Sequence, residues 1–307
     1  MSAAAGADLV ALEVMAPAVT GLVQGSVYGL LGLGLVLLYK SNRIFNFAQA
    51  EFGGVAAFTW IFFDTGKGFL PDTPTPVAVV LGIAMAVVVA LITERLVVRP
   101  LFNAPKITVV VATAGVLLLL IAVEGFLYGG EAGSFPAIFS GDAINEGAIR
   151  VTNQGLAIIV ALLVLAVASA LFFSRSRYGT AILAVSQEAT ASRLVGISVE
   201  RISALTWGLA GFLAGVAGIL LAGSIGLAAP GSLTGLALVP AFTAAVFGGV
   251  TSMPGALVGG IVIGVIESLA TANIPKENLP GSGQVVLFVA LLLVLLVRPA
   301  GLLGKET

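Results

Sequence analysis

The chain contains no cysteine and no histidine, and only 9% of its 307 residues are charged. These absences exclude disulfides, Cys/His zinc sites, histidine-based catalysis and histidine pH sensing. Soluble domains carry about 25% charged residues, so 15 acidic and 14 basic residues are too few to cover a soluble surface of this size. The net charge of −1 gives no sign of nucleic-acid binding. With 59% hydrophobic residues, the composition indicates an integral membrane protein.

Motifs for chemistry are also lacking. The sequence contains no Gly-x-x-x-x-Gly-Lys-Ser/Thr phosphate loop, no metal-ligand cluster and no nucleophile–base pair. We therefore expect that the chain is not an enzyme and binds no metal or cofactor itself. The segment 1–17 has acidic but no basic residues, so we expect no cleavable secretion signal there.

Long apolar stretches predict the fold. A helix needs about 20 apolar residues to cross the hydrocarbon core of a bilayer. Stretches that approach or reach this length lie at 17–39, 44–63, 76–98, 107–128, 153–174, 202–224, 235–250, 255–272 and 281–298. Asn46, Gln49 and Glu51 interrupt the second, and the seventh is short and ends in a Gly-rich break, so either is a candidate half-span. We predict one all-α transmembrane domain over residues 1–307, with about eight or nine transmembrane helices.

Basic residues are distributed unevenly between alternate loops. With the N-terminus outside, the cytoplasmic segments hold Lys40, Arg43, Arg95, Arg99, Lys106, Arg175, Arg177, Arg193, Arg201, Arg298 and Lys305. The outer segments hold only Lys67, Arg150 and Lys276. Because Lys and Arg are enriched in cytoplasmic loops, we expect a multi-pass protein of the cell (inner) membrane with its N-terminus outside and its C-terminus in the cytoplasm. A pair of half-spans would change the number of crossings but not this bias.

Glycines recur at intervals of four residues within the predicted helices. The pattern occurs at Gly21, Gly25 and Gly29, at Gly211 and Gly215, at Gly255 and Gly259, and at Gly260 and Gly264. Small residues at this spacing allow helix backbones to approach closely in lipid. We expect tight helix crossings at these positions.

Two nine-residue segments match at six positions. Residues 47–55 read Phe-Ala-Gln-Ala-Glu-Phe-Gly-Gly-Val, and residues 242–250 read Phe-Thr-Ala-Ala-Val-Phe-Gly-Gly-Val. The first lies in an outward span and the second in an inward span, which predicts inverted halves made of spans 1–4 and 6–9, with span 5 as a connector. Chance similarity of apolar sequence is the alternative. The candidate repeat and hinge residues are Phe47, Phe52, Gly53, Gly54, Phe242, Phe247, Gly248, Gly249, Pro254 and Gly255.

Polar residues within the predicted spans are candidates for a solute path. They are Gln24, Ser26, Asn46, Gln49, Glu51, Glu124 and Glu267. The spacing of Asn42, Asn46 and Gln49 predicts one shared helix face, from which Glu51 points away by about 160°. The alternative is that each glutamate pairs with a backbone group or an arginine near a helix end.

The cytoplasmic segment 175–201 predicts a short helix at 187–195, outside the membrane. Ser186 suits its N-cap, Gln187 and Glu188 suit its first turn, and Gly196 suits its C-terminal stop. A short capped helix suits the docking of a soluble partner, through Ser186, Gln187, Glu188, Ala189, Arg193, Leu194 and Gly196. An ordinary basic loop is the alternative. The outer segments 64–75 and 129–152 are interpreted as ordered caps or partner surfaces, or as plain connecting loops.

Three blocks of the sequence resemble one known family, the permease subunits of branched-chain amino-acid ABC importers of the LivH type. The first block is 21–58, centred on Asn46-Phe47-Ala48-Gln49-Ala50-Glu51. The second is 177–218, with Gln187-Glu188-Ala189 and Leu194-Val195-Gly196-Ile197, and the third is 242–267, with Phe247-Gly248-Gly249-Val250-Thr251-Ser252-Met253-Pro254-Gly255. The chain departs from the family at Gln49-Ala50, where a His-Gly pair is common, and at Thr251, where Gly is common.

The resemblance implies a transport subunit that moves a small polar solute, such as a branched-chain or related amino acid, by alternating access. It implies a complex with a second, homologous and non-identical permease, two cytoplasmic ATPases that carry ATP and Mg²⁺, and an extracytoplasmic solute-binding protein. Segment 175–201 would then hold the helix that couples to an ATPase. The alternatives are an ion-coupled secondary transporter that uses Glu51, Glu124 or Glu267, and a passive channel for a solute such as urea or an amide.

Overall fold

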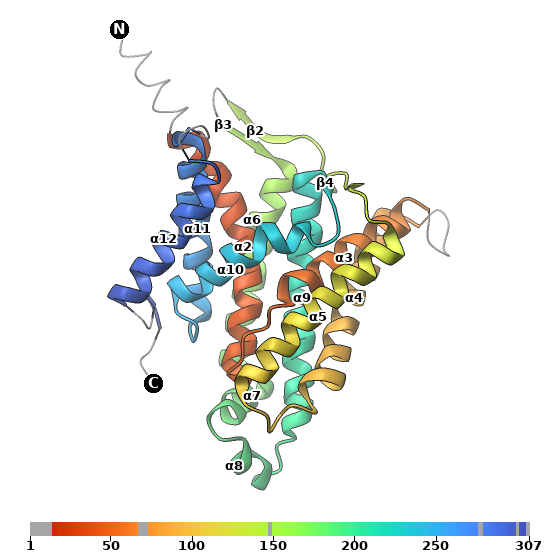
Figure 1. Cartoon of the computed structure of the whole chain (residues 1–307), viewed down its shortest axis with the longest axis vertical. Coiled ribbons are helices and arrows are strands. Elements are labelled where there is room, and N and C mark those ends of the chain that lie inside the picture. The colour runs from red at the N-terminus through yellow and green to blue at the C-terminus, as the bar shows by residue number, and fades with distance from the viewer. Residues whose placement is uncertain (1–13, 67–72, 147–148, 276–278, 299–300, 305–307) are drawn as a thin grey trace.

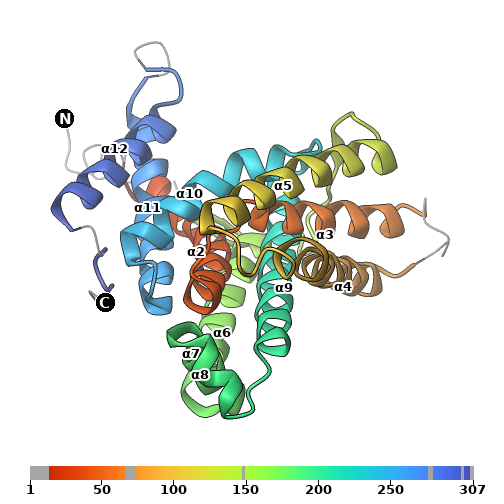
Figure 2. The ribbon, with the colours of Figure 1, turned by 60° about the horizontal axis from the view of Figure 1, so that its bottom comes forward.

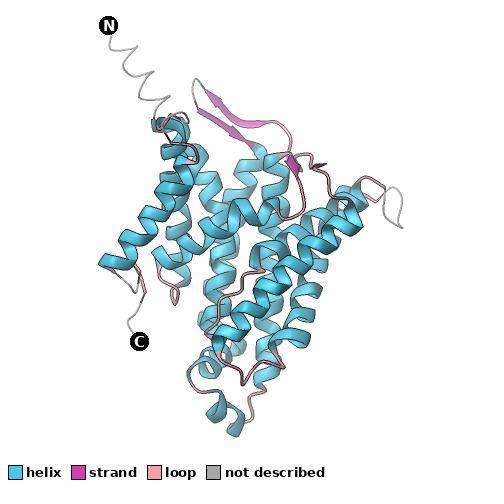
Figure 3. Ribbon diagram, in the orientation of Figure 1, coloured by secondary structure: helices cyan, strands magenta, loops and turns pink. Residues whose placement is uncertain are grey.

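The computed structural model describes residues 14–66, 73–146, 149–275, 279–298 and 301–304. Within these ranges the chain is mainly helical, and short strands lie at one end only (Figure 3). Three of the basic residues counted above, Lys67, Lys276 and Lys305, lie outside the described residues.

Helices make up the body of the protein (Figure 1). In chain order they are α2 (Ala16–Asn42), α3 (Gln49–Asp64), α4 (Thr75–Thr93) with the π-helical turn η2 (Glu94–Val98), α5 (Lys106–Tyr128), α6 (Asn153–Arg175), α7 (Arg177–Gln187), α8 (Ala189–Leu194), α9 (Val199–Ile225), α10 (Ser232–Gly248), α11 (Met253–Asn273) and α12 (Ser282–Val297). The strands form two antiparallel pairs, β1 (Gly133–Ser134) with β4 (Leu227–Ala228) and β2 (Asp142–Glu146) with β3 (Ile149–Thr152).

All nine predicted apolar stretches form helices, which confirms the all-α membrane fold. Among the described residues, six helices are long and apolar enough to cross a membrane: α2, α4 continued by η2, α5, α6, α9 and α11. Helices α10 and α12 are shorter, and α3 has 16 residues. An α-helix satisfies its own backbone hydrogen bonds, and this explains why apolar segments in lipid adopt it.

Two helices form the centre of the bundle. In the most apolar part of α2, 83% of the residues are buried, and in that of α9, 61%. The corresponding shares are 22% for α4 with η2 and 11% for α6, whose apolar side chains point outward. The outer helices therefore expose the apolar surface that lipid requires, while α2 and α9 form the interior of the bundle.

Glycines bring α2 and α11 into direct backbone contact, as their spacing predicts. A Cβ placed on Gly21 would lie 2.6 Å from the carbonyl oxygen of Gly264, and one on Gly25 would meet the backbone of Gly260. In the other half of the bundle, Gly211 of α9 lies against the α4 backbone in the same manner.

The helices form two inverted halves, α2–α5 and α9–α12. Helix α2 descends from the end that carries the β2–β3 hairpin to the end that carries α7 and α8, and α9 ascends in the opposite direction (Figure 1). Equivalent helices of the two halves make equivalent contacts. Helix α2 packs on α11, as α9 packs on α4, and α3 packs on α9, as α10 packs on α2. Within the halves, α3 packs on α5, as α10 packs on α12. The predicted inverted architecture is therefore present, with α6 outside both halves.

The register of the repeat differs from the prediction. Helices α2 and α9 each have 27 residues, and their first residues, Ala16 and Val199, are 183 positions apart (199 − 16). The first residues of α3 and α10, Gln49 and Ser232, are also 183 apart (232 − 49). The matching segments 47–55 and 242–250 are offset by 195 instead (242 − 47), so one begins a helix and the other ends one. The equivalence of these two segments was wrong, although the halves that they suggested are real.

Basic side chains gather at the end of α7 and α8. Arg175 and Arg177 lie where α6 passes into α7, Arg193 lies in α8 and Arg201 lies in the first turn of α9, and these elements meet at one end of the molecule (Figure 2). At the opposite end, Arg150 of the β2–β3 hairpin pairs with Asp142. The described charges thus follow the predicted asymmetry between the two ends.

Candidate functional site

The chain leaves helical geometry between α2 and α3. Arg43 ends α2 in the left-handed region with φ 56°, and α3 begins only at Gln49, inside the protein. The backbone of the link is held by side chains: Thr113 of α5 accepts a hydrogen bond from the Phe47 N–H (3.2 Å), and Asn46 accepts one from the Ala48 N–H (3.0 Å). The predicted interruption is present only before α3, which starts five residues later than the stretch 44–63 and runs unbroken through Gln49 and Glu51.

Two buried amides anchor this link. Gln49 donates through Nε2 to the carbonyl oxygen of Ala210 on α9 (3.0 Å), and Asn46 donates to Gln49 Oε1 (3.4 Å). Both amides are fully buried. The prediction that Asn42 shares a helix face with them was wrong, because Asn42 is the last residue of α2 and the helix is interrupted after it. Asn46 and Gln49 thus position the link between α2 and α3.

Two carboxyl groups meet beside α3. A Cβ built on Gly54 would lie 2.9 Å from Glu51 Oε1 and 2.9 Å from Glu124 Oε1, so these oxygens are at most 5.8 Å (2 × 2.9 Å) apart. Glu51 is 0% exposed, and Glu124 of α5 is 1% exposed. Thr234 of α10 donates a short hydrogen bond to Glu51 Oε2. Glu51 thus points away from Gln49, as predicted, into a cluster that joins α3, α5 and α10.

Three oxygens of this cluster have no hydrogen-bond partner of standard geometry. They are Oε1 of Glu51 and both carboxyl oxygens of Glu124. No described lysine or arginine forms an ion pair with either glutamate. Buried polar atoms are almost always satisfied, so this concentration of free acceptors marks the cluster as a candidate binding site. The sequence analysis missed Thr234, and the 183-residue offset of the repeat is the signal that would have found it.

The remaining path candidates lie apart from the cluster. Gln24 is exposed on α2, and Ser26 donates to the Leu22 carbonyl oxygen of its own helix (2.7 Å). Glu267 of α11 is half-buried and faces Tyr28 of α2. The structure brings together Glu51 and Glu124 but does not place these three with them.

The second break lies between α10 and α11. Gly248 and Gly255 are in backbone contact across it, and Ser252 caps α11 by accepting a hydrogen bond from the Gly255 N–H (3.1 Å). Gly249 has φ 104°, a conformation that favours glycine. The N–H of Leu302 donates to the Phe247 carbonyl oxygen at the end of α10 (2.8 Å). The predicted break at 248–255 is confirmed.

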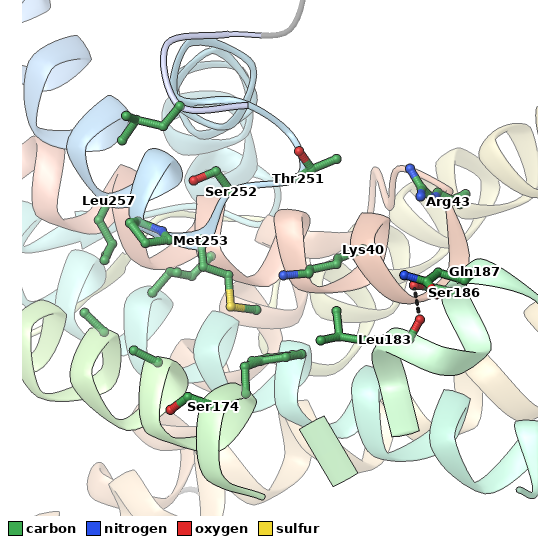
Figure 4. Close-up of a pocket in the computed structure, with 16 residues that line it drawn as sticks. Lys40, Arg43, Ser174, Leu183, Ser186, Gln187, Thr251, Ser252, Met253 and Leu257 are labelled. Carbon is green, nitrogen blue, oxygen red and sulfur yellow. Dashed lines mark hydrogen bonds between the residues drawn. The ribbon is translucent and has the colours of Figure 1, made fainter. Parts of the chain in front are cut away.

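A cavity of about 690 Å³ opens beside this second break (Figure 4). Lys40 and Arg43 of the first break line one side, and Ser186 and Gln187 of α7 line another. Lys40 Nζ lies 5.4 Å from the centre of the Phe173 ring of α6. The cavity thus connects both breaks with the helix that leads into α8.

Segment 175–201 forms two helices at one end of the molecule, and not one. Helix α7 ends at Gln187, and the short helix predicted at 187–195 is α8. Its N-cap is Glu188, which accepts a hydrogen bond from the Thr190 N–H (3.1 Å). The assignment of Ser186 as the cap was wrong, because Ser186 lies within α7 and donates to the Leu183 carbonyl oxygen.

The C-terminal end of α8 presents apolar side chains to solvent. Leu194 is 85% exposed and Val195 is 76% exposed. Gly196 follows α8 with φ 85°, a conformation that agrees with its predicted role in ending this helix. Arg193 forms an exposed ion pair with Glu200 at the start of α9 (3.3 Å). Two large apolar side chains on a compact, capped turn form a surface suited to a partner protein.

Comparison with known proteins gives consistent relatives. The family model described as "Branched-chain amino acid transport system / permease component" matches residues 18–297. The high-affinity branched-chain amino acid transport system permease protein LivH of Escherichia coli K12 is 32% identical over 305 residues, covering 93% of this chain and 94% of that protein. LivH of Salmonella typhimurium is 31% identical over 296 residues with the same coverage. BraD of Pseudomonas aeruginosa is 29% identical over 295 residues, covering 94% of each chain.

Proposed function

The chain belongs to the family of permease components of branched-chain amino acid transport systems, and from this premise we propose that it carries branched-chain or closely related amino acids into the cell. It is a multi-pass membrane subunit of an ABC importer and not an enzyme. The observation that carries the proposed substrate class is the similarity to LivH and BraD over more than nine-tenths of the chain.

Energy for uphill transport comes from partner subunits. ABC permeases work with ATPase and solute-binding components. We assign the α7–α8 end to the cytoplasm, because the described basic residues gather there. A second, homologous permease, two ATPases holding ATP and Mg²⁺, and one extracytoplasmic binding protein would complete the importer.

Helix α8 is the proposed contact to an ATPase. Leu194 and Val195 are the exposed apolar residues that would enter a groove of the ATPase. Helix α7 lines the cavity beside both breaks, so movement of α8 would reach the interrupted helices through α7. ATP-driven closure would then tilt the inverted halves between outward-open and inward-open states.

The alternative is a secondary transporter driven by an ion gradient. The paired carboxyls of Glu51 and Glu124 favour it, because intramembrane acids commonly bind protons or cations. The two functions differ in their energy source, and this difference can be measured.

Reconstituted vesicles test the proposal. The full complex should take up leucine only with ATP and loaded binding protein, and uptake should survive collapse of the proton and sodium gradients. Leucine uptake that needs no ATP and stops when a gradient is collapsed would overturn the proposal.

Two substitutions test the contact of α8. Leu194→Asp should reduce co-purification of the ATPase, and Gly196→Pro should uncouple ATP hydrolysis from uptake, because proline cannot adopt the positive φ of Gly196. Phe139→Asp, at an exposed apolar residue of the opposite end, is the matched control and should leave the ATPase attached. Normal co-purification of the ATPase with Leu194→Asp, together with normal coupling in Gly196→Pro, would overturn the assignment of α8 as the ATPase contact.

A further inference from the structure

We propose that Glu51, Glu124 and Thr234 form the site that holds the ammonium group of the amino acid during its passage. The inference rests on the function proposed above and adds which end of the solute is recognised, and by which atoms.

The position of the cluster in the repeat is the first argument. Glu51 and Thr234 are 183 positions apart, which is the offset that relates α2 to α9 and α3 to α10. They are therefore equivalent residues of the two halves, and they touch. Equivalent residues can touch only close to the axis that relates the halves. In transporters built from inverted repeats, solute sites lie at the interface of the repeats and involve interrupted helices.

The second argument is the number of free acceptors. Three carboxyl oxygens of Glu51 and Glu124 form no hydrogen bond of standard geometry, although these side chains are 0% and 1% exposed. The polar groups nearest to Glu124 are the Glu51 carboxyl group and the Gly231 backbone. A primary ammonium group has three N–H donors and no acceptor. The three donors match the three oxygens in number and in polarity, and Thr234 already fixes the fourth oxygen.

Charge balance is the third argument. Two carboxylates at most 5.8 Å (2 × 2.9 Å) apart repel each other strongly where water is excluded, and they are stable together only with a proton or a cation between them. The described residues supply no basic partner. Mg²⁺ and Ca²⁺ require six or more oxygen ligands, and no group of three or more acidic residues occurs among the described residues. Among cations, an organic ammonium ion fits the charge and the few ligands, and a proton shared by the two carboxyl groups would take its place when no solute is bound.

The proposal also explains the glycine at the centre of the cluster. Any side chain at position 54 would contact both carboxyl groups, because a Cβ there would lie 2.9 Å from each. The absence of a side chain at Gly54 therefore lets the two carboxyl groups approach each other beside α3.

Uptake by the reconstituted complex tests the proposal. Glu51→Gln, Glu124→Gln and the double variant should each reduce leucine uptake at least tenfold, because an amide keeps the shape but not the charge. Stimulation of ATP hydrolysis by loaded binding protein should stay within about twofold of wild type, since α8 is unchanged. Thr234→Val removes the hydrogen bond to Glu51 and should also reduce leucine uptake. Thr243→Val, which removes a buried hydroxyl of the same helix that bonds within α10, is its control and should transport normally.

The outcomes separate this inference from the proposed function. A wild-type complex without ATP-driven uptake refutes the function, whereas normal uptake by the double Gln variant refutes the ammonium site alone. If the variants do not assemble, inhibition of wild-type uptake decides: 3-methylbutylamine, which keeps the ammonium group, should inhibit. 3-Methylbutanol at the same concentration should not. Equal inhibition by both compounds would overturn the proposal.

Discussion

Phe47 and Phe242 pack against each other, with ring centroids 5.8 Å apart. They begin the two segments that match in sequence; Phe47 lies in the link before α3, and Phe242 lies within α10. Phe45 extends the contact, with its ring 4.7 Å from that of Phe242. The link before α3 is thus joined through aromatic rings to the helix that leads into the second break, and we expect movements of the two breaks to be coupled through this contact.

This contact predicts the effect of Phe242→Leu. Leucine keeps the apolar volume but removes both aromatic pairs, each of which contributes about 0.5–1.5 kcal/mol. We expect a fall in Tm and a reduced ratio of leucine transported to ATP hydrolysed. Phe212→Leu, at a residue of α9 that is 36% exposed, should change neither quantity. An unchanged transport ratio in Phe242→Leu would show that the breaks are not coupled through these rings.

Gly54→Ala should impair transport without unfolding the protein. The new methyl group would push apart the carboxyl groups of Glu51 and Glu124, and misplacing a binding group by about 1 Å costs on the order of tenfold or more in rate. Alanine stabilises a helix by about 0.5–1 kcal/mol relative to glycine, so the Tm of Gly54→Ala should not fall below that of the wild type. Gly125→Ala is the control, because nothing lies near its Cβ position in the neighbouring helix α5. Equal uptake in the two variants would contradict the prediction.

Gly264→Leu should destabilise the bundle. The side chain would enter the backbone contact between α11 and α2, and overpacking typically costs about 1–3 kcal/mol. For a protein of this size we expect Tm to fall by about 2–4 °C per kcal/mol. Gly235→Leu in α10 adds the same side chain where no atom lies near the Cβ position. Similar Tm values for both variants would argue against a tight α2–α11 crossing.

Glu188→Ala should weaken coupling through loss of the α8 cap. Replacing an N-cap acceptor by alanine costs about 0.5–2 kcal/mol of helix stability, and α8 has only 6 residues. ATP hydrolysis stimulated by loaded binding protein should therefore drop while the membrane bundle keeps its Tm. Ser186→Ala, which lies in α7 and caps nothing, should behave as wild type. A larger loss of stimulated ATP hydrolysis in Ser186→Ala than in Glu188→Ala would show that Ser186 is the functional cap of α8.

Much of the fold could be predicted because lipid imposes strict rules on sequence. Apolar length located each helix of the membrane bundle, and glycine spacing marked the faces on which α2 and α11 meet, because both depend on local sequence alone. The register of the repeat could not be found from segments 47–55 and 242–250, since apolar sequence with few residue types matches by chance.

The candidate site was only half predictable for a related reason. Glu51 and Glu124 stand out as acids in apolar helices, but their contact depends on how α5 packs against α3, and no local pattern encodes this. Thr234 carries no charge and resembles many membrane threonines until its equivalence with Glu51 is known. Ser186 and Glu188 illustrate a further limit, since both suit an N-cap and only the end of α7 decides between them.

The crossing of α2 with α11 has a consequence for biosynthesis. The first helix of each half packs on the third helix of the other half, so neither half can complete its own interior. Gly21 and Gly264 are 243 residues apart (264 − 21), and ribosomes add about 5–20 residues per second. After α2 enters the bilayer, its glycine-lined face therefore waits on the order of 10–50 s for its partner. During that interval the nascent chain depends on the insertion machinery or on lipid to shield this face, and chains truncated before α11 are expected substrates for membrane proteases.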